Sequence, residues 1–161
     1  VILFGLRKDI IDQLEVKFPP PPSHAREPGL LNYLKPWVSC GEALKEIPEP
    51  NGMSNLPNHT GSNYKMRFNG YLGHRYVDAD KPAPTITARG DDKGGVVIIH
   101  HPNNSRRMTV RETATIQSFP IDFVFSGSNS SAYRQIGNAV PPLFSSRIAM
   151  SIKDTFKLIG R

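Results

Sequence analysis

The chain has 161 residues, a length that suits one domain with a hydrophobic core of its own. Its net charge of +6 favours a polyanionic partner such as nucleic acid, because clustered lysines and arginines gain affinity by releasing counterions from phosphates. The one cysteine excludes an internal disulfide and a zinc site built from several cysteines, and no stretch approaches the roughly 20 apolar residues of a membrane span.

The N-terminal part contains one candidate strand and one stiff segment. Residues 1–6 form a short, continuous apolar run rich in β-branched residues, which is typical of a strand buried on both faces. Such a strand needs a neighbour on each side. Four consecutive prolines within residues 18–24 predict a polyproline II segment, and we expect a domain boundary there.

Short strands and turns are expected in the middle of the chain. Residues 41–47 can form one or two helical turns before Pro48 ends them. Residues 71–77, 84–88 and 96–99 have the composition of strands, and turn-forming residues separate them. The pattern predicts a β-rich meander.

A capping motif predicts where the next helix begins. Thr109 and Glu112 have the spacing of a capping box, so a helix should begin near Val110 and end before Phe119. Within it, Glu112 can satisfy a backbone amide at the start of the helix, and Arg111 can be a solvated residue on the helix face.

A last helix should begin at Pro141 or Pro142 and continue to about Gly160, because proline is favoured in the first turn of a helix and glycine just after its end. Its apolar residues recur at steps of three and four and form one stripe: Phe144, Ile148, Ile152, Phe156 and Ile159. This stripe requires a partner surface.

Gly137 and Asn138 precede that helix and form a candidate ligand site. Glycine permits a conformation or a close approach that other residues do not, and the asparagine amide both donates and accepts hydrogen bonds. Such a pair can hold a small polar ligand. It can equally be a tight turn in which Asn138 caps the helix.

Residues 84–90 form a second candidate site, because small hydroxyl side chains, Arg89 and Gly90 together suit contact with a phosphate group. The same residues can also be an edge strand that enters a turn. Further basic residues of the meander would extend a groove-facing surface: His74, Arg75, His100, His101, Arg106 and Arg107. Adjacent histidines in a strand point to opposite faces, so no metal site is expected at residues 100–101.

Three stretches of sequence together resemble a known family. Residues 106–112, 117–120 and 133–142 resemble the last two conserved blocks of cytosine-5 DNA methyltransferases. Over its whole length the chain looks like the C-terminal half of a bacterial member, with its target recognition domain and last conserved motifs. The blocks in which that family places its nucleophilic cysteine and its cytosine-binding glutamate do not occur in this sequence.

The resemblance implies an α+β architecture. Residues 1–11 would add a strand to an α/β S-adenosylmethionine-dependent methyltransferase domain, most of which lies outside this chain. Residues 12–108 would form a β-rich target recognition domain. Residues 109–161 would carry the conserved C-terminal motifs and return the final helix to the catalytic domain.

The resemblance also implies which residues bind cofactor and DNA. Those that match the cofactor site are Gly137, Asn138, Ala139 and Val140, and many members have serine where this chain has Ala139. The candidates for DNA binding are Arg75, Thr85, Thr87, Arg89 and Gly90, of which Thr85 matches a threonine beside the extruded cytosine. Arg111 and Glu112 match a pair that organises the recognition region.

No catalytic residue is assigned to this chain. The family's nucleophile is a cysteine that follows a proline, whereas Cys40 follows Ser39. We interpret Cys40 as a small, buried, apolar residue. Metal ligands are not assigned either.

The function implied by the resemblance is DNA (cytosine-5)-methyltransferase activity in a bacterial restriction-modification system, which would place the protein in the cytoplasm with the nucleoid. This chain would recognise double-stranded DNA and form part of the S-adenosylmethionine pocket. The complementary N-terminal half would bring the nucleophile, either as a second subunit or as the rest of the same polypeptide. The alternative is a non-catalytic, sequence-specific DNA-binding module.

Overall fold

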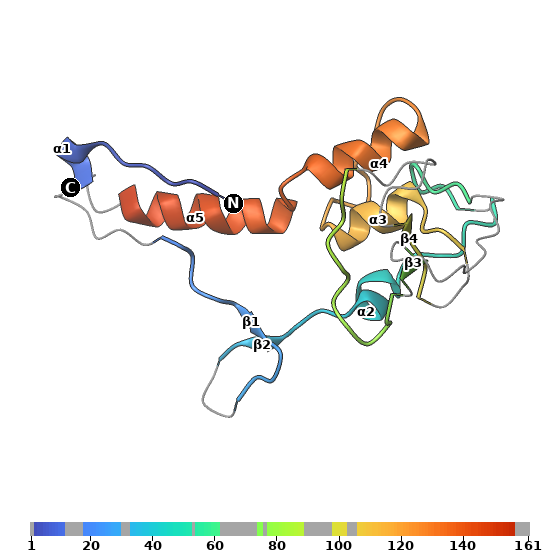
Figure 1. The fold of residues 1–161 in the computed structure, drawn as a ribbon, viewed down its shortest axis with the longest axis horizontal. Coiled ribbons are helices and arrows are strands. Elements are labelled where there is room, and N and C mark those ends of the chain that lie inside the picture. Colours follow the sequence, from blue (N-terminus) through green and yellow to red (C-terminus); the bar gives the residue numbers. More distant parts are fainter. Residues whose placement is uncertain are drawn as a thin grey trace.

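The computed structural model describes residues 2–11, 18–29, 33–52, 54–61, 74–75, 77–88, 98–102 and 106–156, and the statements below concern these residues. Figure 1 shows the arrangement of their helices and short strands. In chain order they are α1 (Lys8–Ile11), β1 (His24–Ala25), β2 (Lys35–Pro36), α2 (Cys40–Leu44), β3 (His74–Arg75), β4 (Ile98–Ile99), α3 (Val110–Ile116), α4 (Asn129–Asn138) and α5 (Pro142–Phe156).

The strands form two separate parallel pairs. In the first pair, β1 lies beside β2 with His24 opposite Lys35. In the second, β3 lies beside β4 with His74 opposite Ile98. The mixture of helices and strands agrees with the predicted α+β class at a coarse level. Within the described ranges the chain is not β-rich, since each named strand has two residues.

Helix α3 is the centre of the fold. It contacts both α2 and α4, and five consecutive residues, Val110 to Ala114, are buried around its whole circumference. The core around it consists of Cys40, Leu44, Val77, Ile86, Met108, Val110, Ala114, Phe125, Ala132 and Ile136. Figure 1 shows α2, α3 and α4 grouped together, with α5 extending away from them.

The ends of α3 and α5 agree with the sequence analysis. Thr109 Oγ1 accepts a hydrogen bond from the Glu112 N–H, and the Glu112 carboxylate accepts one from the Thr109 N–H, so the capping box is confirmed. Helix α3 ends at Ile116, before Phe119 as predicted. Helix α5 begins at Pro142, again as predicted; Gly160 lies outside the described residues.

The remaining observations on the helices concern α2 and the length of α5. The short helix expected over residues 41–47 is α2, and the Ser39 hydroxyl caps it by accepting from the Glu42 N–H. Helix α5 has 15 residues. Among the described helices, none is long and apolar enough to cross a membrane.

Two predicted strands are wrong. Residues 2–6 form no strand, and Leu3 is 92% exposed, because none of the described strands lies beside them to supply the neighbours that a buried strand requires. Val1 lies outside the described residues. Residues 84–88 also form no strand, and the backbone of residues 87–88 lies against Gly137 of helix α4.

The remaining strand predictions are partly testable. The described part of residues 71–77 contains β3, and that of residues 96–99 contains β4, so both are confirmed in part. Some of the residues in each range lie outside the described residues.

The predicted apolar stripe of α5 is only partly covered within the described part of the chain. Ile148 and Ile152 are half-buried, whereas Phe144 and Phe156 are exposed. Outside the stripe, Leu143 and Met150 are exposed, and the fully buried residues of the helix are Ser151 and Thr155. The fold therefore leaves several large apolar side chains of this helix exposed.

Candidate functional site

The connection between α4 and α5 contains the Gly137-Asn138 pair. Helix α4 continues through Asn138, and the Ala139 N–H donates to the Ile136 carbonyl group at 3.2 Å. The pair is therefore the end of a helix. It is neither a tight turn nor an N-cap, so that structural interpretation was wrong. The link from α4 to α5 consists of residues 139–141.

Gly137 lies in direct contact with the backbone of residues 87–88. A Cβ atom at position 137 would stand 2.4 Å from the Ala88 nitrogen and 2.4 Å from the Thr87 carbonyl carbon. Atoms that are not bonded do not approach so closely, so only glycine fits without movement of one backbone. The sequence predicted that Gly137 could allow a close approach, and this prediction is confirmed. The contact brings together the two candidate sites, the Gly137-Asn138 pair and residues 84–90.

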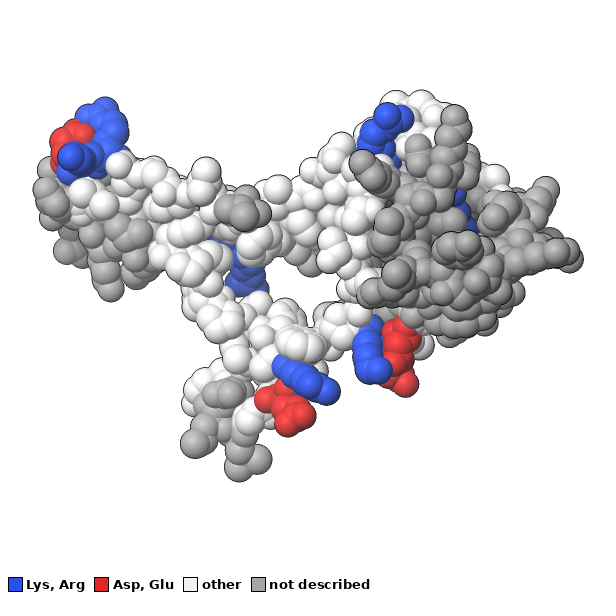
Figure 2. All heavy atoms as spheres, in the orientation of Figure 1, with Lys and Arg blue, Asp and Glu red and all other residues white. Residues whose placement is uncertain are grey.

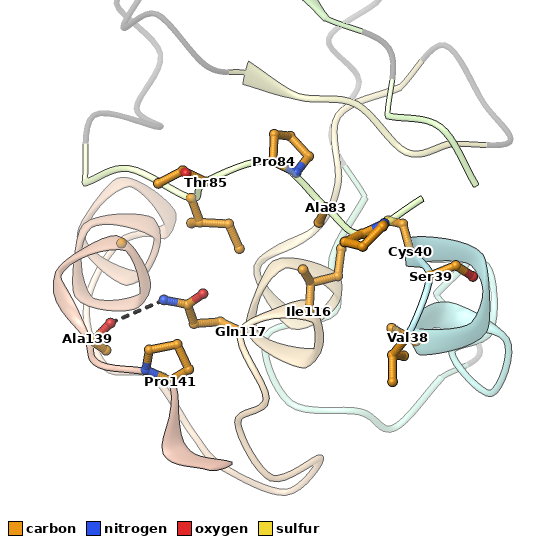
Figure 3. A pocket seen from close by; sticks show the side chains of 14 residues that line it. Val38, Ser39, Cys40, Ala83, Pro84, Thr85, Ile116, Gln117, Ala139 and Pro141 are labelled. Atoms are coloured by element: carbon orange, nitrogen blue, oxygen red, sulfur yellow. Dashed lines mark hydrogen bonds between the residues drawn. The ribbon is translucent and has the colours of Figure 1, made fainter. Parts of the chain in front are cut away.

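A cavity of about 540 Å³ opens where these segments meet. Thr85 contributes to one wall, Gly137 and Ala139 to another, and the Gln117 side chain lies between them (Figure 3). Asn138 and Val140 are not among the lining residues and are exposed. The four predicted cofactor residues thus face two directions: Gly137 and Ala139 face the cavity, and the other two face solvent.

The predicted DNA-binding residues are only partly described. Ile86 is buried in the core, whereas Thr85 is exposed and Thr87 half-buried. This places both hydroxyl side chains on the outer side of the segment. The backbone of Arg75 belongs to β3, and its side chain is outside the described part. Arg89 and Gly90 lie outside the described residues.

Arg111 is buried, with 0% of its surface exposed, so the solvated alternative was wrong. Its guanidinium group donates to the carbonyl oxygens of Pro57 at 3.0 Å, Pro120 at 2.9 Å, and Phe123. Burial lowers the pKa of Arg111, and the charge of Asp122 opposes this shift. The side chain joins two separate loops to α3.

Glu112 lies at the centre of a buried polar network. Its carboxylate accepts from both terminal nitrogens of Arg106, at 2.8 and 2.9 Å, and Arg106 also pairs with Glu49 at 3.1 Å. Burial raises the pKa of Glu112, but hydrogen bonds from Arg106 and Thr109 outweigh it and leave the pKa below its usual value. Helix α3 is anchored on both sides by this network and by Arg111.

The predicted basic surface is wrong for His100, His101 and Arg106. His100 and His101 are buried. Arg106 is paired with carboxylates, and Arg107 lies over the Tyr133 ring, with its guanidinium carbon 4.1 Å from the ring centroid. For Arg106 the sequence showed the positive charge, but not that the carboxylates of Glu49 and Glu112 lie beside it.

Figure 2 agrees with this distribution of charge. On the face it shows, the described lysines and arginines occur in small separate groups rather than as one continuous patch. Several exposed cations have acidic partners nearby, as in the pairs Lys45–Glu42 and Lys81–Asp78. The net charge therefore does not produce a single basic surface on this face of the described chain.

Cys40 is a small buried residue, as predicted, with 1% of its surface exposed. Burial, together with the negative charge of Glu112, raises its pKa to about 11. Its thiol is therefore almost entirely protonated near neutral pH. Within the described ranges, no group of three or more His, Cys, Asp and Glu residues could hold a metal ion.

Three long-range contacts around the candidate site were not predicted from the sequence. Gln117 donates to the Ala139 carbonyl group at 3.1 Å, as Figure 3 shows, and the Ser118 hydroxyl accepts from the Leu143 N–H at 3.1 Å. His59 contacts the Thr109 hydroxyl through Nδ1 at 2.9 Å. All three join residues distant in sequence, so no local pattern indicates them.

The chain is similar to a defined family of proteins. The model of the family described as C-5 cytosine-specific DNA methylase matches residues 32–154. The type II methyltransferase M.NgoFVII of Neisseria gonorrhoeae is 36% identical over 85% of this chain and 41% of its own length. The type II methyltransferase M1.HphI of Haemophilus parahaemolyticus is 30% identical over 86% of this chain and 40% of its own length.

A shorter relative is also similar. The type II methyltransferase M.AquIB of Picosynechococcus sp. is 29% identical over 70% of this chain and 78% of its own length. The chain thus spans about two fifths of the first two relatives and most of the third.

Proposed function

Because the chain belongs to the C-5 cytosine-specific DNA methylase family, we propose that it supplies DNA recognition and one wall of the cofactor site in a DNA (cytosine-5)-methyltransferase. The reaction transfers a methyl group from S-adenosylmethionine to C5 of a cytosine in a specific duplex sequence. The relatives are type II methyltransferases, which supports a role in a restriction-modification system.

One observation carries this proposal: the contact of Gly137 with the backbone of residues 87–88. Methylation of a base in duplex DNA requires that the base leave the stack and meet the methyl donor. Through this contact the segment with Thr85 and Thr87 lies against the C-terminal end of α4, which includes Asn138 and is followed by Val140. A base held by the first segment would therefore lie near a cofactor held by the second.

The residues at the helix end suit the cofactor. S-adenosylmethionine supplies a methyl group bound to a positively charged sulfur. Gly137 and Ala139 are small and leave space, the exposed Asn138 amide can both donate and accept, and Val140 offers exposed apolar surface. The cavity beside them has a volume in the range of about 300 to 1,000 Å³ that is typical of ligand sites.

The nucleophile must come from another part of the enzyme. Cytosine-5 methylation uses a thiolate that attacks the base. Cys40 is buried, and its pKa of about 11 keeps the thiol protonated. We therefore propose that the complementary N-terminal half brings the catalytic cysteine.

Helix α5 is where we expect that half to bind. Leu143 is 70% exposed and Met150 54% exposed, and Val140 and Phe144 are exposed near them. Several large apolar side chains exposed on one helix support an interaction site there. M.NgoFVII extends well beyond the region that this chain matches. We therefore expect the rest of the enzyme to bury the exposed apolar side chains of α5. The match to most of M.AquIB supports a separate subunit of this size.

The test is reconstitution. The chain, the N-terminal half, and a mixture of the two are each incubated with unmethylated duplex DNA and S-adenosylmethionine labelled in its methyl group. We expect label in DNA only from the mixture. Methyl transfer by the chain alone would contradict the proposal that the N-terminal half brings the catalytic cysteine. If the mixture binds DNA but transfers no methyl group, the alternative of a non-catalytic DNA-binding module is favoured.

A further inference from the structure

The link between α4 and α5 has few hydrogen bonds of its own. It consists of residues 139–141, and both Pro141 and Pro142 lack a backbone N–H. The last carbonyl groups of a helix have no partner within the helix and need donors from elsewhere. The position of this link therefore depends on contacts from other elements.

Gln117, directly after helix α3, provides such donors. Its side-chain Nε2 donates to the Ala139 carbonyl group at 3.1 Å and lies 3.4 Å from the Ile136 carbonyl oxygen. Figure 3 shows the side chain reaching across the cavity wall to the link. One carboxamide thus holds the last turn of α4 and the first residue after it.

Ser118 holds the other end of the same link. Its hydroxyl accepts from the Leu143 N–H at 3.1 Å, in the first turn of α5. Ser118 has a φ of 66°, a left-handed conformation that is uncommon for a residue other than glycine. Backbone strain of this kind persists where surrounding contacts determine the conformation. Two consecutive residues after α3 therefore fix both sides of residues 139–141.

We propose that Gln117 is a positioning residue for cofactor binding, which holds the α4–α5 link so that Asn138 and Val140 present their side chains to S-adenosylmethionine. The inference rests on the proposed function. Gln117 itself need not touch the cofactor. Its effect passes through the backbone carbonyl group of Ala139, which lies between the two presenting residues.

The position of the link matters because ligand contacts require a defined geometry. A hydrogen bond weakens steeply when its atoms are displaced or misaligned. Gly137 fixes α4 against residues 87–88, so α4 itself stays in place when the Gln117 contact is removed. The expected consequence is local: weaker binding of the cofactor, with DNA binding preserved.

The experiment measures cofactor affinity rather than activity. The chain is assembled with its N-terminal half, and dissociation constants of S-adenosylmethionine and of duplex DNA are measured by calorimetry for the unmodified complex and for Gln117→Met. Methionine keeps the length of the side chain and removes its donors. The matched control is Gln135→Met, since Gln135 also donates to a backbone carbonyl, that of Ser126, but on the exposed side of α4.

We expect Gln117→Met to bind S-adenosylmethionine about tenfold more weakly, because the Ala139 carbonyl group loses its side-chain donor and the link is no longer held in one position. DNA affinity and the midpoint of thermal unfolding should stay close to those of the unmodified complex. Gln135→Met should change neither affinity. Equal cofactor affinity in Gln117→Met and the unmodified complex would overturn the inference, as would an equal loss of cofactor and DNA affinity.

A second variant keeps the test informative if Gln117→Met does not fold. Ser118→Gly removes the hydroxyl acceptor and fits the left-handed conformation better than serine. It should also weaken cofactor binding severalfold, and unchanged affinity would count against the proposal. If the unmodified complex neither binds S-adenosylmethionine nor methylates DNA, the proposed function fails. If it does both, only the role of Gln117 is in question.

Discussion

The carbonyl carbon of Thr87 lies 2.4 Å from the place that a Cβ atom would occupy at Gly137. This contact joins residues 87–88 to the C-terminal end of helix α4, 50 residues later in the sequence. It sets the distance between the hydroxyl side chains of Thr85 and Thr87 and the residues that begin the α4–α5 link. Its consequences can be measured directly.

Replacement of Gly137 by alanine should destabilise the protein. In a helix, alanine is normally favoured over glycine by about 1 kcal/mol. Here the new methyl group would meet backbone atoms at 2.4 Å, which cannot move as a side chain would. Overpacking of this kind costs about 1–3 kcal/mol. We expect a lower free energy of unfolding in urea and weaker DNA binding by the assembled enzyme.

The control for this variant is Gly5→Ala, because nothing lies within 4 Å of a Cβ atom at that position. Its free energy of unfolding should stay within about 0.5 kcal/mol of that of the unmodified protein. A Gly137→Ala protein that was more stable than the unmodified one would show that the contact with residues 87–88 is not formed.

Arg111 should be one of the most sensitive positions for stability. The Arg111→Met variant keeps much of the apolar volume but removes the guanidinium donor of three carbonyl oxygens, those of Pro57, Pro120 and Phe123. The Pro120 carbonyl group still accepts from the Phe123 N–H at 3.1 Å, whereas the other two lose this donor. Each unsatisfied buried group costs about 1–3 kcal/mol. We therefore expect a loss of about 3 kcal/mol or more, measured by chemical denaturation.

Arg134 provides the comparison for Arg111. It lies exposed on helix α4, so Arg134→Met should change the free energy of unfolding by less than about 0.5 kcal/mol. Similar losses in the two variants would mean that the positive charge matters more than the three carbonyl contacts.

The comparison of these two arginines shows what sequence could and could not predict. The capping box, the limits of α3 and the start of α5 follow from local chemistry, and the pattern of residues 109–112 and 141–142 sufficed to find them. The burial of Arg111 depends on the loops around residues 57 and 120–123. No local pattern at residue 111 indicates either loop.

The same distinction explains the two wrong strands. Residues 1–6 and 84–88 have strand composition, but a strand also needs a hydrogen-bonding neighbour, which composition does not reveal. Within the second range, residues 87–88 instead contact a helix at its glycine, Gly137. In the candidate site, the sequence indicated that Gly137 was special, whereas the contribution of Gln117 required the folded arrangement.

Stability should fall as the pH is lowered, in two separate ranges. Burial lowers the pKa of His101 below its ordinary value of 6.5, with Glu112 and Glu49 opposing the shift and Arg106 adding to it. Above pH 6.5 the histidine is neutral in both states. Below it the unfolded chain binds the proton first, so the folded state loses stability until the folded pKa is passed.

Glu112 affects the stability of the protein over a lower range of pH. Its pKa in the folded state lies below the ordinary value of 4.5, so its contribution is fully present above about pH 4.5 and is lost as the pH falls through the folded pKa. Denaturation curves at pH values from 3 to 8 would show both ranges. In Glu112→Gln the lower range should disappear, and in His101→Asn the decline that begins near pH 6.5 should disappear. An unchanged profile in either variant would contradict the assignment.

The exposed face of α5 should determine how tightly the chain binds its complementary half. Leu143 and Met150 are the most exposed of its large apolar side chains, and burial of each would contribute about 1.5–3 kcal/mol. The double variant Leu143→Ser, Met150→Ser should therefore weaken association by about 3 kcal/mol or more, measured by analytical ultracentrifugation or by the concentration of N-terminal half needed for methyl transfer. Ser145→Ala on the same helix should leave the association constant unchanged. If the double variant associates as tightly as the unmodified chain, the N-terminal half binds elsewhere, and α5 faces solvent in the assembled enzyme.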